Sequence, residues 1–423
     1  MPNHDIASCR TDAPSLNRAQ RDLLHVFRAV VNGRTPDTPP TDWAAVQHLA
    51  CLHELDAYLF PAVRNWPDAC RPPQPLLDEW RRTFLSRTVA AVRTSRQIGE
   101  LLAALHAADV PTMPLKGAWL AEHVYDDIAF RPMHDIDLLI RPDRLLAARR
   151  AMAAAGYLAC EPAEPSPWCK DQHFRHPARA LGVELQWHLW TTGHQELTEP
   201  ALDRFWSQPL PAQVAGQPAM ALPPARHLIY LTYHLLAHHW WVPLRTHLDL
   251  VLLGRRYGDS LSSDDLAAEA HAWQLGFRAP FVWRVAHDLC DAPVPAALTG
   301  WTPPDADGLK NKRSAAAKAA LQEIPLRVNM SVSLADFQRA PAWRRPALAL
   351  RLVFLPVGAL RVAHPRAMRR FGLIGGYAAR LVDLLHRRMR ALLPGATRRT
   401  EVFKAINDMS TRLDLDRWLR AQE

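Results

Sequence analysis

The chain has 423 residues, which is enough for two or three domains and a substantial core. Hydrophobic residues make up 48% of it, which excludes an intrinsically disordered protein. The formal charge of +9 fits a phosphate-bearing ligand, nucleic acid or an anionic membrane surface, and equally an arginine-rich composition that serves no partner.

Cysteine usage and the apolar segments bear on the compartment. The six cysteines include no Cys-x-x-Cys pair and match no zinc module, so we predict free thiols in a reducing cytoplasm. The first 15 residues lack the apolar core of a signal peptide. The apolar stretch at 348–362 is interrupted by Arg351, Pro356 and Arg361, which makes it too charged to span a bilayer. We therefore expect a cytoplasmic protein with no transmembrane segment.

Residues 1–90 form the predicted N-terminal helical region. Apolar residues recur at helical spacing over 16–30, where Ser15 is a plausible N-cap. A second helix is expected directly after Asp42, over 43–60, and a third over 74–108.

Residues 91–210 have a different pattern, in which short apolar runs alternate with helical segments. Strands are predicted at 109–117, 135–140 and 181–190. Helices are predicted at 118–125 and 143–157, the second with Asp143 near its start and Gly156 just past its end. This order predicts an α+β fold in which a small mixed-sheet core is flanked by helical regions on both sides.

The remainder is predicted to be helical. Residues 211–325 form a C-terminal helical domain with helices at 223–241, 245–258 and 262–276, the last capped by Ser263 or Asp264. Residues 326–423 form a basic, proline-containing tail with an arginine-rich helix at 364–393. We interpret that helix as one with a solvated basic face, while RNA or a membrane surface stays open as its partner.

The stretch "RPMHDIDLLI" contains the clearest candidate chemistry. Side chains two apart on a strand point to the same side, so Asp135 and Asp137 are expected side by side with Ile136 facing the core. Two such carboxylates repel each other unless a cation lies between them, and Mg²⁺ prefers carboxylates together with phosphate oxygens. Glu184 on the next plausible strand is expected to complete the metal site or to act as a base.

The core also resembles a known family. It is similar to the uncharacterised nucleotidyltransferase family, a branch of the DNA polymerase β-like superfamily, in a Leu-Lys-Gly turn, an Arg before an Asp-x-Asp strand, and a helix that ends in Gly-Tyr. The matching residues are Leu115, Lys116, Gly117, Tyr125, Arg131, Asp135, Asp137, Leu138, Leu139, Gly156 and Tyr157. The family's Glu-Leu-His-Trp-like strand reads Glu184, Leu185, Gln186, Trp187, so Gln186 replaces the usual His and the carboxylate is kept.

The resemblance implies a nucleotidyltransferase core, a bound nucleoside triphosphate and Mg²⁺ or Mn²⁺. Asp135, Asp137 and Glu184 would then be the metal-binding and catalytic residues, and Lys116, Gly117 and Arg131 would bind the nucleotide. A nucleoside monophosphate would pass to a hydroxyl or phosphate of a small molecule, a peptide or a protein. The fold does not specify which acceptor is used.

Three histidines are further candidates for contacts with the acceptor or the cleft. His234 and His238 share one face of a predicted helix, where they could contact the cleft, pack in the core, or bind zinc together with Asp249. His173 is expected on a loop before the Glu184 strand, within reach of an acceptor.

Alternatives stay open for the charged residues and for the function. Arg131 could instead pair with Asp126 or Asp127, and Glu184 could be an exposed strand residue. The alternative function is a catalytically degenerate, basic helical protein that binds a nucleic acid or protein partner, for which the net charge is the support. Nucleic acid is a possible partner, but it is not the favoured one.

Overall fold

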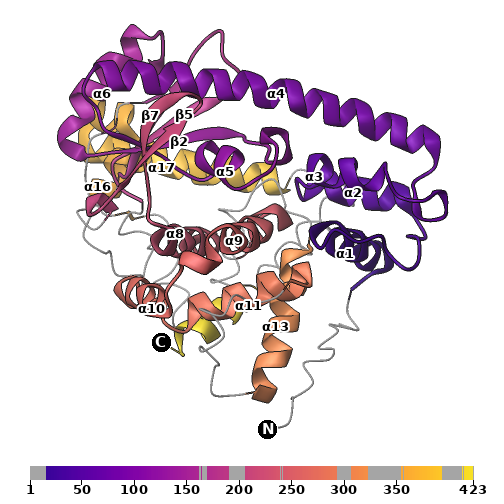
Figure 1. The fold of residues 1–423 in the computed structure, drawn as a ribbon. Helices are drawn as coiled ribbons and strands as arrows, with labels where there is room; N and C mark the ends of the chain where they lie inside the picture. The colour runs from indigo at the N-terminus through magenta and orange to yellow at the C-terminus, as the bar shows by residue number, and fades with distance from the viewer. Residues whose placement is uncertain are drawn as a thin grey trace, which may run out of the picture.

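The computed structural model describes residues 16–161, 163, 169–189, 205–238, 240, 242–292, 306–322, 354–355, 357–392, 412 and 414–422. Helices surround a five-stranded mixed sheet (Figure 1), which confirms the predicted α+β class. None of the helices in these described segments is long and apolar enough to cross a membrane.

The described part of the N-terminal region, from residue 16, is helical as predicted. It contains α1 (Arg18–Val31), α2 (Trp43–Leu52), α3 (Asp56–Val63) and the first part of α4 (Gln74–Ala107). The Asp42 side chain caps α2 by accepting a hydrogen bond from the backbone of Ala45. Asn17 caps α1, while the predicted cap Ser15 lies outside the described residues. The single helix predicted at 43–60 is wrong, because Glu54 has a φ of 58° and separates α2 from α3.

The sheet has the strand order β1-β2-β5-β4-β3. Its strands are β1 (Thr112–Pro114), β2 (Asp135–Ile140), β3 (Leu158–Ala159), β4 (Asp171–Arg175) and β5 (Gly182–Gln186). The central pair β2 and β5 is parallel, and the other pairs are antiparallel. The loop predicted around His173 is wrong, because His173 lies in β4, where the neighbouring Gln172 and Phe174 are buried.

Helices and a hairpin border the sheet. The helices are α5 (Gly117–His123) and α6 (Leu145–Ala154), and the hairpin pairs β6 (Leu210–Val214) with β7 (Gln217–Ala221). Gly156 follows α6 with a φ of 87°, as the predicted cap requires. Asp143 does not begin the helix as predicted, because it lies in a short 3-10 turn at Pro142–Arg144.

The described residues after the β6–β7 hairpin are mostly helical, as predicted. They contain α8 (Pro224–Ala237), α9 (Leu244–Tyr257), α10 (Ser263–Ala272), α11 (Arg278–Cys290), α13 (Ala306–Ala320), α16 (Val357–Ala363) and α17 (Pro365–Leu392). Ser262 caps α10 one residue before the two predicted caps, by accepting from the backbone of Asp265.

Two apolar cores give the two faces of β2 different surroundings. Ile136, Leu138 and Ile140 pack in the core that contains the inner faces of α4 and α6. Leu139 belongs to the larger core, which joins the N-terminal helices to α8, α9 and α11. A shift of β2 by one residue would push Asp135 and Asp137 into apolar surroundings, so the burial pattern specifies the register. The two aspartates therefore face the C-terminal helices.

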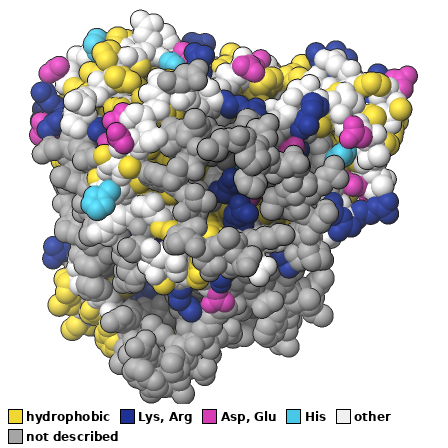
Figure 2. All heavy atoms as spheres, turned by 60° about the horizontal axis from the view of Figure 1, so that its bottom comes forward, with side chains coloured by type: hydrophobic (Ala, Val, Ile, Leu, Met, Phe, Trp, Pro, Cys, Tyr) yellow, Lys and Arg dark blue, Asp and Glu magenta, His cyan; other side chains and the backbone are white. Residues whose placement is uncertain are grey.

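The surface shows where the basic charge of the chain lies. In Figure 2, Lys and Arg side chains are scattered among acidic and apolar ones over the described part of one face. On α17 the exposed side chains include Phe371, Ile374 and Val382 in addition to arginines, so the solvated face of this helix is partly apolar.

Candidate active site

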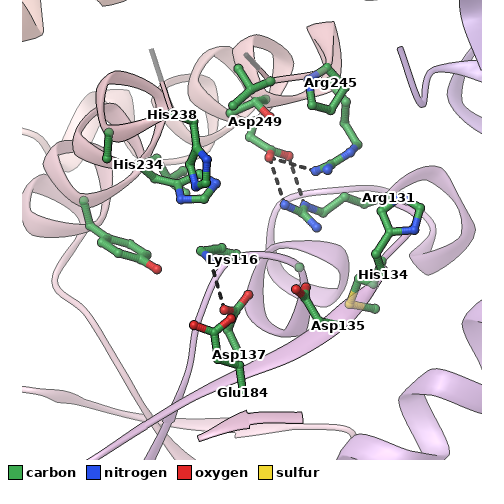
Figure 3. Close-up of a pocket in the computed structure, with 18 of the residues that line it drawn as sticks. Lys116, Arg131, His134, Asp135, Asp137, Glu184, His234, His238, Arg245 and Asp249 are labelled. Carbon is green, nitrogen blue, oxygen red and sulfur yellow. Dashed lines mark hydrogen bonds and ion pairs between the residues drawn. The ribbon is translucent and has the colours of Figure 1, made fainter. Parts of the chain in front are cut away.

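A pocket of about 390 Å³ lies between the β2–β5 face of the sheet and helices α8 and α9 (Figure 3). From the sheet side it is lined by Lys116, Gly117, Arg131, Asp135, Asp137, Lys170, Glu184 and Gln186. From the helical side it is lined by Tyr230, Tyr233, His234, His238, Arg245 and Asp249, among others. Eight of the nine predicted site residues therefore line one pocket, and His173 is the exception.

The acidic residues come from adjacent parallel strands. Asp137 on β2 is directly opposite Glu184 on β5, and Asp135 lies two residues earlier on the same face. Ile136 points the other way and is fully buried. The two carboxylates of Asp137 and Glu184 lie close together in Figure 3, with Asp135 to one side.

Asp137 is held in a nearly closed environment. Its side chain is 4% exposed and accepts hydrogen bonds from the Lys116 ammonium at 3.0 Å and from the Gln186 amide at 2.7 Å. Burial, together with the charges of Glu184 and Asp135, raises the pKa of Asp137 to about 6, although the charge of Lys116 opposes this rise. Gln186, which replaces the His expected from the resemblance, thus supplies a hydrogen-bond donor to the carboxylate of Asp137.

Glu184 has a lysine partner of its own. The Lys170 ammonium contacts Glu184 at 2.7 Å and also contacts Asp171. Burial favours the neutral acid, but Lys170 outweighs it together with a hydrogen bond from Asp171, and the pKa of Glu184 falls to about 2. Burial and the neighbouring Glu184 raise the pKa of Asp171. Glu184 is therefore ionised beside its lysine partner.

The donor set fits a divalent cation. Carboxylate oxygens are the preferred ligands of Mg²⁺ and Mn²⁺, and two crowded carboxylates are relieved by a cation between them. Among the described residues, one group of three metal-ligand side chains has its atoms within 4.8 Å of one another, and it consists of Asp171, His173 and Glu184. The predicted set of Asp135, Asp137 and Glu184 shares Glu184 with that group and lies on the same sheet face.

The Lys-Gly turn has a conformation that the sequence did not indicate. Lys116, and not Gly117, has the positive φ, at 46°. A Cβ on Gly117 would overlap the Arg131 guanidinium and the Met133 side chain. Gly117 therefore makes room for Arg131 beside the pocket.

Arg131 forms its ion pair with Asp249 on α9. Its guanidinium binds Asp249 through two hydrogen bonds of 3.1 and 3.0 Å, so a pairing with Asp126 or Asp127 is wrong. Tyr125 donates to the same carboxylate at 2.6 Å, and Arg245 contacts it at 3.2 Å.

The ion-pair network continues into the N-terminal region. Arg245 also binds Glu54 at 2.7 Å, and Glu54 contacts His134 at 2.7 Å. Glu54 comes from the break between α2 and α3, so the sheet, the N-terminal helices and α9 meet at the pocket.

The histidines occupy two places. His234 and His238 have ring centroids 4.5 Å apart and line the helical wall of the pocket. Burial first, then the charge of Lys116, holds the pKa of His234 well below its usual range, so its ring is neutral at neutral pH. Their zinc alternative gains no support, because Asp249 is bound by Arg131 and Tyr125. His173 lies opposite Glu184 in the β4–β5 register.

Sequence reasoning missed several residues of this site. Lys170 and Asp171 stand at the start of β4, and the alternation of buried Gln172 and Phe174 along "DQHFR" was the available signal. Tyr125 was noted only as a family match and Asp249 only as a possible zinc ligand. Both of them, like Glu54 and Arg245, gain their roles from contacts between distant segments.

The chain is similar to one known family. A family model described as uncharacterised nucleotidyltransferase matches residues 39–291, a range that includes every residue of the pocket named above. No curated protein and no solved structure matches the chain.

Proposed function

We propose that this protein, which belongs to the uncharacterised nucleotidyltransferase family, transfers a nucleoside monophosphate from a nucleoside triphosphate to an acceptor, with Mg²⁺ or Mn²⁺. The acceptor group is a hydroxyl or phosphate of a small molecule, a peptide or a protein. The observation that supports this most directly is the alignment of Asp137 with Glu184 on adjacent parallel strands in the pocket, each with a lysine partner.

The transfer forms one bond at the α-phosphorus of the triphosphate and breaks another. An acceptor oxygen forms a bond to the α-phosphorus, the bond from that phosphorus to the oxygen bridging the β-phosphate breaks, and pyrophosphate leaves. The proton of an acceptor hydroxyl passes to a carboxylate of the pocket. A divalent cation bound to Asp135, Asp137 and Glu184 would polarise the phosphate and neutralise charge on the leaving group.

The chain's own residues bind and orient the substrate. Lys116 supplies positive charge beside Asp137, where the phosphates are expected. Neutral His234 and the neighbouring His238 face this region from α8 and offer hydrogen-bonding groups to the nucleotide or the acceptor (Figure 3). The paired Arg131 holds the pocket wall in place through Asp249.

Nucleotide binding with and without Mg²⁺ tests this function. The wild type is expected to bind a non-hydrolysable triphosphate analogue only with the metal, and Asp137→Asn to weaken that binding by at least about tenfold, because a ligand carboxylate is lost. Asp37→Asn, on an exposed loop, is the matched control and should bind like the wild type. Equal binding by wild type and Asp137→Asn, or no metal-dependent binding by either, favours a catalytically degenerate binding protein instead. If binding does depend on the metal and on Asp137, incubating wild type with each labelled triphosphate and a cell extract would identify the acceptor.

A further inference from the structure

We propose that Lys170 and Lys116 are exchangeable counter-ions: they neutralise the pocket carboxylates without metal, and they move to the nucleotide phosphates when a divalent cation binds. Lys170 is thereby an additional phosphate-binding residue. This inference rests on the proposed function and adds a named residue and an order of events to it.

The charges that line the pocket lead to this exchange. Its described lysines and arginines are Lys116, Arg131, Lys170 and Arg245. Each already contacts a carboxylate within 3.2 Å: Lys116 with Asp137, Lys170 with Glu184, and both arginines with Asp249. A triphosphate entering the pocket as it stands would therefore meet only cations that have an acidic partner, so it needs a rearrangement or added positive charge.

The two arginines are poorly suited to such a rearrangement. The side chains of Arg131 and Arg245 are 7% and 10% exposed, and Asp249 between them is 1% exposed. Arg131 is bidentate to Asp249, and removing it would leave a buried charge without its main partner.

The two lysines are suited to it. Their side chains are 19% and 22% exposed, and a lysine ammonium is a point charge on a flexible stem. Lys170 contacts both Glu184 and Asp171, which is the position a cation would take between them. A divalent cation bound to these carboxylates would replace the ammonium groups, and both lysines would then have phosphates within the same pocket as new partners.

The exchange has a consequence that a purely structural lysine would not produce. Neutralising Lys170 removes a competitor of the metal, so metal binding without nucleotide should become tighter. It also removes a phosphate partner, so nucleotide binding with saturating metal should become weaker. The two affinities move in opposite directions, whereas loss of a structural contact would weaken both.

The experiment uses the full chain and Mn²⁺, whose free concentration is read by electron paramagnetic resonance. We expect Lys170→Gln to bind Mn²⁺ about fivefold tighter than wild type, since a unit charge a few ångströms away is worth about 1 kcal/mol even in water. The same variant should bind a non-hydrolysable triphosphate analogue about tenfold more weakly at saturating Mn²⁺. Lys170→Arg, which keeps the charge, and Arg93→Gln on the exposed side of α4 are the controls and should leave Mn²⁺ binding near wild type.

A second measurement needs no variant. Acetylation of the wild type, read by mass spectrometry, should label Lys170 faster with Mn²⁺ alone than without metal, and more slowly once the analogue is added. The proposed exchange is overturned if Lys170→Gln binds Mn²⁺ as tightly as wild type or more weakly. It is also overturned if the acetylation rate of Lys170 does not change when Mn²⁺ is added. If wild type binds no Mn²⁺, or binds it equally after Asp137→Asn, then the proposed function itself fails.

Discussion

Asp249 is a buried carboxylate at the pocket that is bound by three different side chains. Its carboxylate is 1% exposed and accepts hydrogen bonds from Tyr125, Arg131 and Arg245. A buried charge is tolerated only where its partners satisfy it, so these groups depend on one another. The role of Asp249 is therefore to keep two arginines ordered beside the carboxylates.

Asp249→Asn is expected to lower the free energy of unfolding by about 3–5 kcal/mol, because two buried guanidinium groups lose their shared counter-ion. Tyr125→Phe removes one hydrogen bond to the same carboxylate and should cost about 1.5–3 kcal/mol. Urea unfolding measures both. The exposed Asp37→Asn should stay within about 0.5 kcal/mol of wild type. A smaller loss for Asp249→Asn than for Tyr125→Phe would contradict this account.

At the level of elements, the sequence was sufficient for the strands that contain an apolar run and are largely buried. The run 135–140 and the stretch around Glu184 were predicted as strands, and both are central in the sheet. The strand β4 was missed because it is only five residues long and mostly polar in sequence. Two of its residues, Gln172 and Phe174, are buried, and they alternate with the exposed His173 and Arg175. Alternation this short is weak evidence next to a loop.

Contacts between distant elements could not be predicted from the local sequence pattern. Arg131 and Asp249 are 118 residues apart, and their pairing depends on how α9 packs against the loop before β2. The break at Glu54 likewise follows from a left-handed backbone conformation inside a stretch whose apolar spacing continues. Local periodicity carries no information on either point.

Gly117, in the turn between β1 and α5, leaves space for the side chains of Arg131 and Met133. Gly117→Ala is expected to displace Arg131 and Met133 and to lower the free energy of unfolding by about 1–3 kcal/mol, as overpacking does. Gly182→Ala on β5 is the matched control, because its added Cβ meets only the Phe174 carbonyl oxygen at an ordinary 3.6 Å. Urea unfolding and Mn²⁺ binding measure the outcome. Equal effects of the two substitutions would show that Gly117 is not needed for the approach of Arg131.

At the scale of the whole molecule, the helical regions are joined through a shared core. The larger core contains residues of α1, α8, α9 and α11, and α4 runs across the predicted boundary at residue 90. The division into regions 1–90, 91–210, 211–325 and 326–423 stays a prediction. Because the N-terminal and C-terminal helices share apolar contacts, we expect one cooperative unfolding transition for the described parts of both.

Three buried histidines make this shared core sensitive to acid. His53, His227 and His247 are at most 1% exposed. Burial lowers the pKa of His53 to about 4 and the pKa values of His227 and His247 to about 3. Each ring is neutral in the folded and the unfolded chain above pH 6.5. Below that pH the unfolded chain takes up protons that the folded chain does not, so the free energy of unfolding falls as pH falls.

His247 isolates this effect, because its ring is buried against Trp240 and both His53 and Arg412 lower its pKa further. Asp137 and His134 have raised folded pKa values, which change stability with pH in the opposite sense, so the informative quantity is the difference between variant and wild type. In His247→Phe, the stability lost between about pH 7.5 and about pH 5 should be smaller by about 2 kcal/mol, the contribution of one proton over that range. Urea unfolding at both pH values measures it, with His106→Phe on the exposed side of α4 as control. An equal loss in His247→Phe and wild type would mean that the buried ring takes up its proton without unfolding the core.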